Sequence, residues 1–146
     1  MTSRRVDRLL MRIVGPQVFG RVEYLIAKDR RDSWGGPMNG QQGRVDLCRQ
    51  LVESLLPRAI VETGTFRGTT TRFLAQFGVP VHTVESDPRQ FAFAGANTRA
   101  DRDRIRITLG DSRSFLRKLA DDPSVPKDRV FFYLDAHWGA DLPLAE

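Results

Sequence analysis

Hydrophobic residues recur along the chain with two different periods. Between residues 6 and 56 the spacing is helical, and it predicts helices over residues 6–14, 18–26 and 44–56. From residue 58 the pattern changes to short apolar runs, which predict strands at residues 59–62, 81–85, 105–109 and 130–134. Helical patterns at about 69–77, 88–100 and 113–120 separate these strands. The alternation predicts an α/β fold with a Rossmann-like parallel sheet flanked by helices.

The part of the chain before the first predicted strand falls into segments. Residues 1–32 predict a basic helical arm, which Gly15 and Pro16 break into two amphipathic helices. Residues 33–43 (SWGGPMNGQQG) hold four glycines and a proline, which predict a linker, and residues 44–146 form a Rossmann-like domain. We expect the apolar stripes of the arm to pack on the domain or on a second subunit, in preference to binding a membrane surface.

Composition narrows the class of protein. The chain has 146 residues, and 40% of them are hydrophobic, which fits one globular domain. Residues 1–31 hold eight basic and three acidic side chains, which is the whole net charge of +5, so a nucleic-acid-binding core gains no support. No apolar stretch is long enough for a transmembrane segment or a secretory signal, and the single Cys48 cannot form an internal disulfide. We expect a cytoplasmic protein.

The turn after the first strand is a candidate ligand-binding site, because ligands of parallel sheets bind beyond the carboxyl ends of the strands. A glycine-containing turn between a strand and a helix lets an anionic ligand approach the backbone. A dinucleotide fingerprint would need glycines at positions 64, 66 and 69, but Phe66 and Thr69 stand at two of them. The turn has instead an acid followed by glycines two and six positions later, at Glu62, Gly64 and Gly68.

This pattern resembles motif I of the class I S-adenosylmethionine-dependent methyltransferases. Phe66, at the middle glycine position, is most similar to catechol O-methyltransferase and related small-molecule O-methyltransferases. Glu85 ends the second strand 23 residues after Glu62, where the family places an acid that accepts hydrogen bonds from the ribose hydroxyls. The resemblance implies a cofactor site that contains Glu62, Gly64, Phe66, Gly68 and Glu85.

The other strand ends agree with the resemblance. Asp111 and Ser112 follow the third strand, where the family contacts the adenine; they equally suit the N-cap of the next helix, and both roles are compatible. The segment DAHW after the fourth strand is similar to the family's acid–histidine–aromatic segment beside the transferable methyl group. The resemblance implies catalytic roles for Asp135 and His137 and a cofactor contact for Trp138, with cofactor packing as the equal alternative for His137.

The resemblance also implies the reaction and its cofactors. The expected function is O-methylation of a small molecule with S-adenosylmethionine as methyl donor. In the catechol O-methyltransferase branch the acid that matches Asp135 binds magnesium, so Asp135 is the only candidate metal ligand. Ala136 separates it from His137, and the family's other ligands follow a fifth strand. A magnesium ion held by one protein carboxylate would be weakly bound.

The family's sheet has seven strands, whereas we expect four here, in the order 3-2-1-4, and therefore an incomplete fold with an apolar edge at the fourth strand. Two alternatives to a methyltransferase stay open. One is a truncated, non-catalytic module for cofactor binding or assembly. The other, more remote, is a GDSL-like hydrolase that uses Ser112, Asp135 and His137. We expect a small-molecule acceptor, no nucleic-acid partner, and a homo-oligomer formed through the N-terminal helices or the fourth-strand edge.

Overall fold

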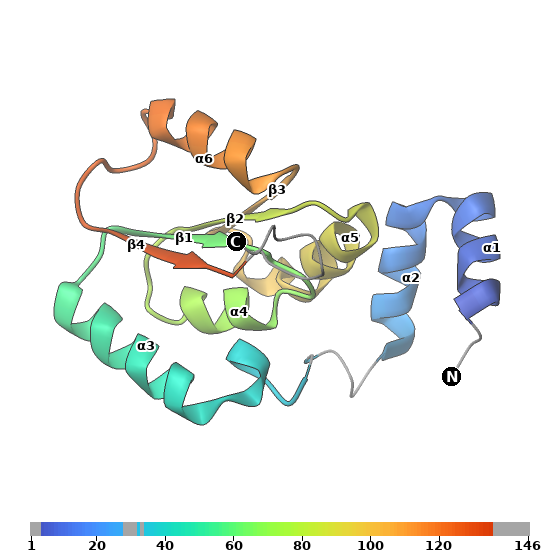
Figure 1. Cartoon of the computed structure of the whole chain (residues 1–146), viewed down its shortest axis with the longest axis horizontal. Helices are drawn as coiled ribbons and strands as arrows, with labels where there is room; N and C mark the ends of the chain where they lie inside the picture. Colours follow the sequence, from blue (N-terminus) through green and yellow to red (C-terminus); the bar gives the residue numbers. More distant parts are fainter. Residues whose placement is uncertain (1–3, 28–31, 33, 136–146) are drawn as a thin grey trace, which may run out of the picture.

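The computed structural model describes residues 4–27, 32 and 34–135, and these contain a parallel sheet between layers of helices (Figure 1). The strands are β1 (Ala59–Thr63), β2 (Val81–Glu85), β3 (Ile105–Leu109) and β4 (Val130–Leu134). They are hydrogen-bonded in the order β3-β2-β1-β4, and every pair is parallel. The predicted fold class and strand order are confirmed, and only β1 differs from its predicted bounds, by one residue.

The two central strands, β1 and β2, are buried along their whole length because helices cover both faces of the sheet. On one face, α3 (Gln42–Leu55) and α4 (Thr69–Ala75) pack against both strands. On the other face, α6 (Ser112–Asp121) places Phe115 against Val61 and Val84. Figure 1 shows α6 on the side of the sheet opposite α3 and α4. The sheet is thus enclosed at its centre, and ligands can reach it only beyond the strand ends.

Aspartates begin the two helices that follow β2 and β3. The carboxylate of Asp87 accepts a hydrogen bond from the backbone N–H of Arg89 (2.7 Å) and begins α5 (Pro88–Asn97). The carboxylate of Asp111 accepts one from the backbone N–H of Ser114 (2.9 Å) and begins α6. α5 is shorter than predicted because the chain changes at Thr98 to a 3-10 turn, η3 (Arg99–Asp101).

The predicted linker contains a short 3-10 turn, η2 (Pro37–Gly40), that lies against α4. Met38 within it is buried in the core below the sheet, and its backbone N–H donates a hydrogen bond to the Thr70 hydroxyl (3.0 Å). Burial of one large apolar side chain therefore fixes this stretch beside the first turn of α4.

The arm consists of α1 (Arg4–Val14) and α2 (Pro16–Ala27), and α2 lies along α5 (Figure 1). Gly20 is buried at this contact, and the ring of Tyr24 meets that of Phe93 edge-on, with centroids 5.5 Å apart. None of the helices in the described part of the chain has the length and apolar character needed to cross a membrane.

In the described part of the chain the apolar stripes of the arm stay exposed and do not pack on the domain, so packing on a second subunit, the other predicted arrangement, stays a prediction. We define the hairpin face as the aliphatic residues of α1 and α2 that stay exposed, between 40% and 73%: Leu9, Leu10, Ile13, Val14, Val18, Val22, Leu25 and Ile26. α2 instead docks through the opposite side of the helix, because Gly20 there allows a close approach. A Cβ atom on Gly20 would lie 2.1 Å from the backbone oxygen of Arg89.

Candidate functional site

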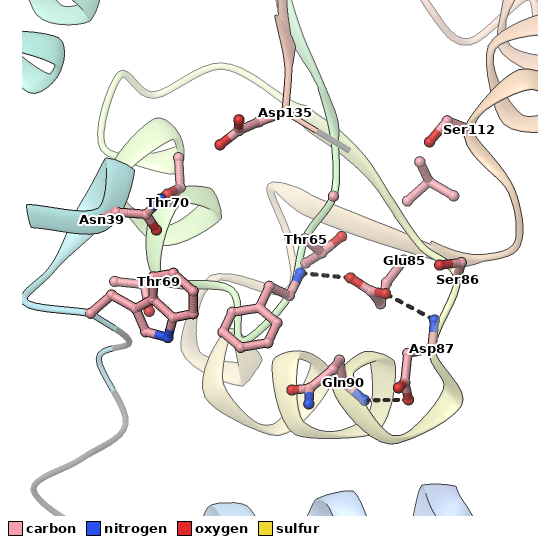
Figure 2. A pocket seen from close by; sticks show the side chains of 14 residues that line it. Asn39, Thr65, Thr69, Thr70, Glu85, Ser86, Asp87, Gln90, Ser112 and Asp135 are labelled. Carbon is pink, nitrogen blue, oxygen red and sulfur yellow. Dashed lines mark hydrogen bonds between the residues drawn. The ribbon is translucent and has the colours of Figure 1, made fainter. Parts of the chain in front are cut away.

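A crevice of about 520 Å³ opens beyond the carboxyl ends of the strands (Figure 2). Its size is that of a site for a small molecule or cofactor. Its walls come from the turns after β1 and β2, the start of α6, the end of β4, the first turns of α4 and α5, and the loop before α3. The lining residues are Trp34, Asn39, Gly64, Thr65, Phe66, Thr69, Thr70, Val84, Glu85, Ser86, Asp87, Gln90, Ser112 and Asp135.

The turn after β1 brings bare backbone to this crevice. Gly64 has a φ of +86° and Gly68 a φ of +78°, a region that L side chains rarely adopt. At Gly68 space is short as well, because a Cβ atom would lie 2.9 Å from the side chain of Thr98. Phe66, between the two glycines, has a φ of +50°. The sequence pattern of two glycines around an aromatic thus corresponds to a sharply folded turn.

Glu85 holds this turn in place. Its Oε2 accepts a hydrogen bond from the backbone N–H of Phe66 (2.7 Å), and its Oε1 accepts one from the backbone N–H of Asp87 (2.8 Å), as Figure 2 shows. The residue is 8% exposed and lines the crevice. A carboxylate has about four lone-pair positions, so two backbone donors leave capacity for a pair of ligand hydroxyls. The position and orientation of this carboxylate are therefore set before any ligand binds.

Glu62 lies under the crevice and does not line it. Its side chain is fully buried, and its Oε2 accepts hydrogen bonds from the hydroxyls of Thr71 (2.5 Å) and Thr83 (2.7 Å). The Thr83 hydroxyl also lies 2.7 Å from that of Thr65, which faces the crevice. Burial raises the pKa of Glu62 to about 7, although the two hydroxyls that bond it act in the opposite direction. Glu62 is thus placed to position the turn.

Asp135 faces the crevice from the end of β4. The Tyr133 hydroxyl donates a hydrogen bond to Asp135 (3.1 Å), and Arg44 donates one to the Tyr133 oxygen (2.9 Å). The Arg44 guanidinium also lies 3.8 Å from the Asp135 carboxylate. Burial, and secondarily the charge of Asp135, raise the pKa of Tyr133 to about 12, which keeps its hydroxyl protonated as a donor.

A metal ion at Asp135 stays a prediction, and the described surroundings of this carboxylate disfavour it. A guanidinium at that distance repels a dication, and no group of three or more metal-ligating side chains occurs among the described residues.

Ser112 and Asp111, predicted as a pair, lie differently. Ser112 lines the crevice, whereas Asp111 is exposed and its carboxylate caps α6. Hydrogen bonds from Ser114, first of all from its backbone N–H, hold the pKa of Asp111 below its usual value. The N-cap role is therefore present, and adenine contact by either residue stays a prediction.

His137 and Trp138 lie outside the described residues. Ser112 and Asp135 of the hydrolase alternative line the crevice, but its histidine is His137, so this alternative stays a prediction. The other histidine, His82, lies within β2, where burial lowers its pKa. Its position agrees with the structural role that a mid-strand histidine suggests.

The structure adds lining residues that sequence reasoning missed. Trp34 and Asn39 come from the predicted linker, and the Trp34 ring meets that of Phe66 at 76°, with centroids 6.2 Å apart. Thr70 and Gln90 come from the first turns of α4 and α5. The tryptophan in this glycine-rich stretch is the one sequence feature that could have indicated a contribution to the site, because a large aromatic side chain is unusual in an exposed linker.

No protein-family profile and no curated protein matches this sequence. Solved structures do match. An O-methyltransferase from Bacillus cereus in complex with SAH has a TM-score of 0.59 at 23% identity, and the match covers 90% of this chain and 60% of that one. The O-methyltransferase TomG from Streptomyces achromogenes, involved in tomaymycin synthesis and solved with SAM, has a TM-score of 0.55 at 19% identity, with 90% and 62% covered. Cofactor-bound Rv0187 from MTB has a TM-score of 0.52 at 27% identity, with 87% and 58% covered.

The chain spans about three-fifths of the length of these proteins. Similarity at this level shows the fold, which is that of the class I methyltransferases. The fold that the sequence resemblance implied is therefore confirmed, and the strand order agrees with it.

Proposed function

We propose that this chain binds S-adenosylmethionine in the crevice and that its function is O-methylation of a small molecule. The observation that carries the proposal is the Glu85 carboxylate, held by two backbone N–H groups at the mouth of a glycine turn. An acid at the end of the second strand is where Rossmann-like folds bind ribose hydroxyls. The SAH and SAM complexes among the matching structures support the same ligand.

The remaining walls of the crevice suit the other parts of this ligand. Gly64 exposes backbone where the methionine half would lie, and Phe66 supplies an aromatic surface beside it. Gly68 is buried, does not line the crevice, and would act by shaping the turn. Ser112, across the crevice from the glycine turn, would meet the adenine, with Asp111 next to it. Glu62 would act through Thr83 and the turn, because its carboxyl is buried beneath them.

Methyl transfer requires mainly that the protein positions the donor and the acceptor. The sulfonium donor supplies both the methyl group and its leaving group, so the protein has to hold the acceptor oxygen in line with them. We assign this task to Asp135, and its contacts with Tyr133 and Arg44 support the assignment. It would orient or deprotonate the acceptor hydroxyl. His137 and Trp138 keep their predicted roles beside the methyl group.

Calorimetric titration of S-adenosylhomocysteine into the full chain, wild type and Glu85→Ala, tests the proposal. Hydrogen bonds to a charged group contribute about 1.5–3 kcal/mol each, so we expect affinity to fall at least tenfold. Glu53→Ala is the matched control, because Glu53 is an exposed carboxylate on α3 away from the crevice. Equal affinity in wild type and Glu85→Ala would contradict the ribose role, and no binding by the wild type would contradict the cofactor.

A non-catalytic cofactor-binding module is the second candidate, because a ribose site at Glu85 beside the glycine turn does not by itself require methyl transfer. The same titration does not separate it from an enzyme, since both bind the ligand. Incubation with methyl-labelled S-adenosylmethionine and a set of small phenols and sugars does. Labelled acceptor formed by the wild type and lost in Asp135→Asn would exclude the non-catalytic module.

A further inference from the structure

We infer that the hairpin face is a homodimer interface, in which α1 and α2 of two copies form a four-helix bundle. The hairpin face is exposed although all of its residues are aliphatic. Ile13 and Ile26 are 71% and 73% exposed, although they are among the most apolar residues of the chain. Aliphatic side chains in such numbers are covered by something in a stable protein.

The described residues of the domain leave this face exposed. α2 is attached to α5 through its opposite side, where Glu23 accepts hydrogen bonds from Arg67 (2.6 Å) and Arg89 (2.8 Å). Glu23 is only 16% exposed, and Gly20 beside it leaves no room for even a methyl group. Two charged contacts and a close helix crossing hold α2 in one orientation. The hairpin face is therefore presented outward by a fixed support.

The area fits a second copy of the chain. The eight exposed aliphatic residues present on the order of 700 Å², which exceeds the largest apolar patch of roughly 300–600 Å² on most monomers. It is close to the ~800 Å² that each partner buries in a standard protein interface. A two-fold dimer requires one patch to be complementary to itself, and an antiparallel helix pair with a uniform aliphatic face meets that condition.

Chemistry distinguishes this occupant from a lipid surface. Helices that bind in the membrane interface commonly use tryptophan and phenylalanine as well as leucine on the apolar side. The hairpin face has leucine but neither aromatic residue; the aromatic residues of α2 point elsewhere, with Tyr24 against Phe93 and the Phe19 ring under the Arg89 guanidinium (4.8 Å). A purely aliphatic face resembles the core of a helical bundle.

Sedimentation velocity across the micromolar range tests the inference on the whole chain. We expect a dimer for the wild type and a dissociation constant raised more than tenfold in the double variant Ile13→Glu, Ile26→Glu. The matched control is Leu47→Glu, Leu55→Glu on α3, where the side chains are 56% and 57% exposed, and it should remain a dimer. A monomeric wild type, a dimeric hairpin variant or a control that dissociates would each overturn the inference.

Two measurements complete the test. The melting temperature of the wild type should rise with protein concentration, which checks dimerisation without any substitution. Flotation with phosphatidylglycerol vesicles checks the lipid alternative. If the wild type is a monomer that floats with these vesicles, and the variant Ile13→Glu, Ile26→Glu does not float, the hairpin face binds membranes and the dimer inference is wrong.

Discussion

The interior behind β1 and the rim beyond β2 each contain one glutamate, and the two side chains have opposite surroundings. Glu62 is enclosed on all sides and bonded by threonine hydroxyls. Glu85 lies on the wall of the crevice and is bonded by backbone N–H groups. The residue type is the same in both, but Glu62 lies one residue inside β1 whereas Glu85 is the last residue of β2, so the two side chains meet different neighbours.

This difference separates a positioning role from a binding role. Burial raises the pKa of Glu62 to about 7, so its carboxyl group is partly protonated near neutral pH. The two backbone donors at Glu85 hold both of its side-chain oxygens in place and leave lone pairs for a ligand. The comparison teaches that spacing alone locates strand-end acids, while the hydrogen-bond donors around each acid decide what it does.

The largest effect that would sharpen this comparison is the pH dependence of stability caused by Glu62. Its folded-state pKa of about 7 lies above its ordinary value of 4.5, so the unfolded chain loses this proton first as pH rises. Stability should therefore fall from about pH 4.5 upward, and the loss should be complete above about pH 7. The shift corresponds to ~3 kcal/mol. Urea unfolding at pH 5 and pH 8 measures it.

Glu62→Gln removes the proton equilibrium and keeps an oxygen that accepts from Thr71 and Thr83. We expect the stability of this variant to change with pH by ~3 kcal/mol less than that of the wild type. Glu53→Gln on the surface of α3 is the control and should follow the wild type. The same pH slope in Glu62→Gln and wild type would show that Glu62 is not the group that titrates.

A smaller effect should come from the hydroxyl that joins the two regions. Thr83→Val removes the donor to Glu62 and the contact with Thr65, and leaves a buried oxygen without that partner. We expect a loss of about 1–3 kcal/mol in urea unfolding. The loss should be larger at pH 8 than at pH 5, because the hydroxyl favours the charged form of Glu62.

Thr108→Val is the control for this substitution, since Thr108 is an exposed threonine on β3. It should stay within about 0.5 kcal/mol of the wild type. An equal loss in both variants would mean that strand packing, and not the link to Glu62, determines the cost of Thr83→Val.

Much of this arrangement could be predicted from the sequence. Period and strand length located β2, β3 and β4, because each is a short run rich in β-branched or aromatic residues. The distance from Glu62 to Glu85 placed Glu85 at a strand end beside the glycine turn. Local patterns of this kind can be read from the sequence because they depend on the backbone of only one or two adjacent elements.

Contacts between distant segments could not be predicted in the same way. Trp34 reaches the crevice because Met38, four residues later, is buried beside α4, and no spacing rule relates these residues to Thr70. The uncovered hairpin face had a similar cause. An amphipathic pattern shows which side of a helix is apolar, but α2 docks through Gly20, whose lack of a side chain carries no hydrophobic signal.

The smallest expected effect concerns the third strand-end acid, Asp111, which is exposed and caps α6. Asp111→Ala removes the cap and should lower the melting temperature by roughly 3–5 °C. Asp111→Asn keeps a capping oxygen and should melt like the wild type. If capping is the whole role of Asp111, neither variant changes the affinity for S-adenosylhomocysteine by more than about twofold. A wild-type melting temperature with a weakened affinity in Asp111→Asn would instead assign the carboxylate to the ligand, and would make Asp111 a partner of Glu85 on the crevice wall.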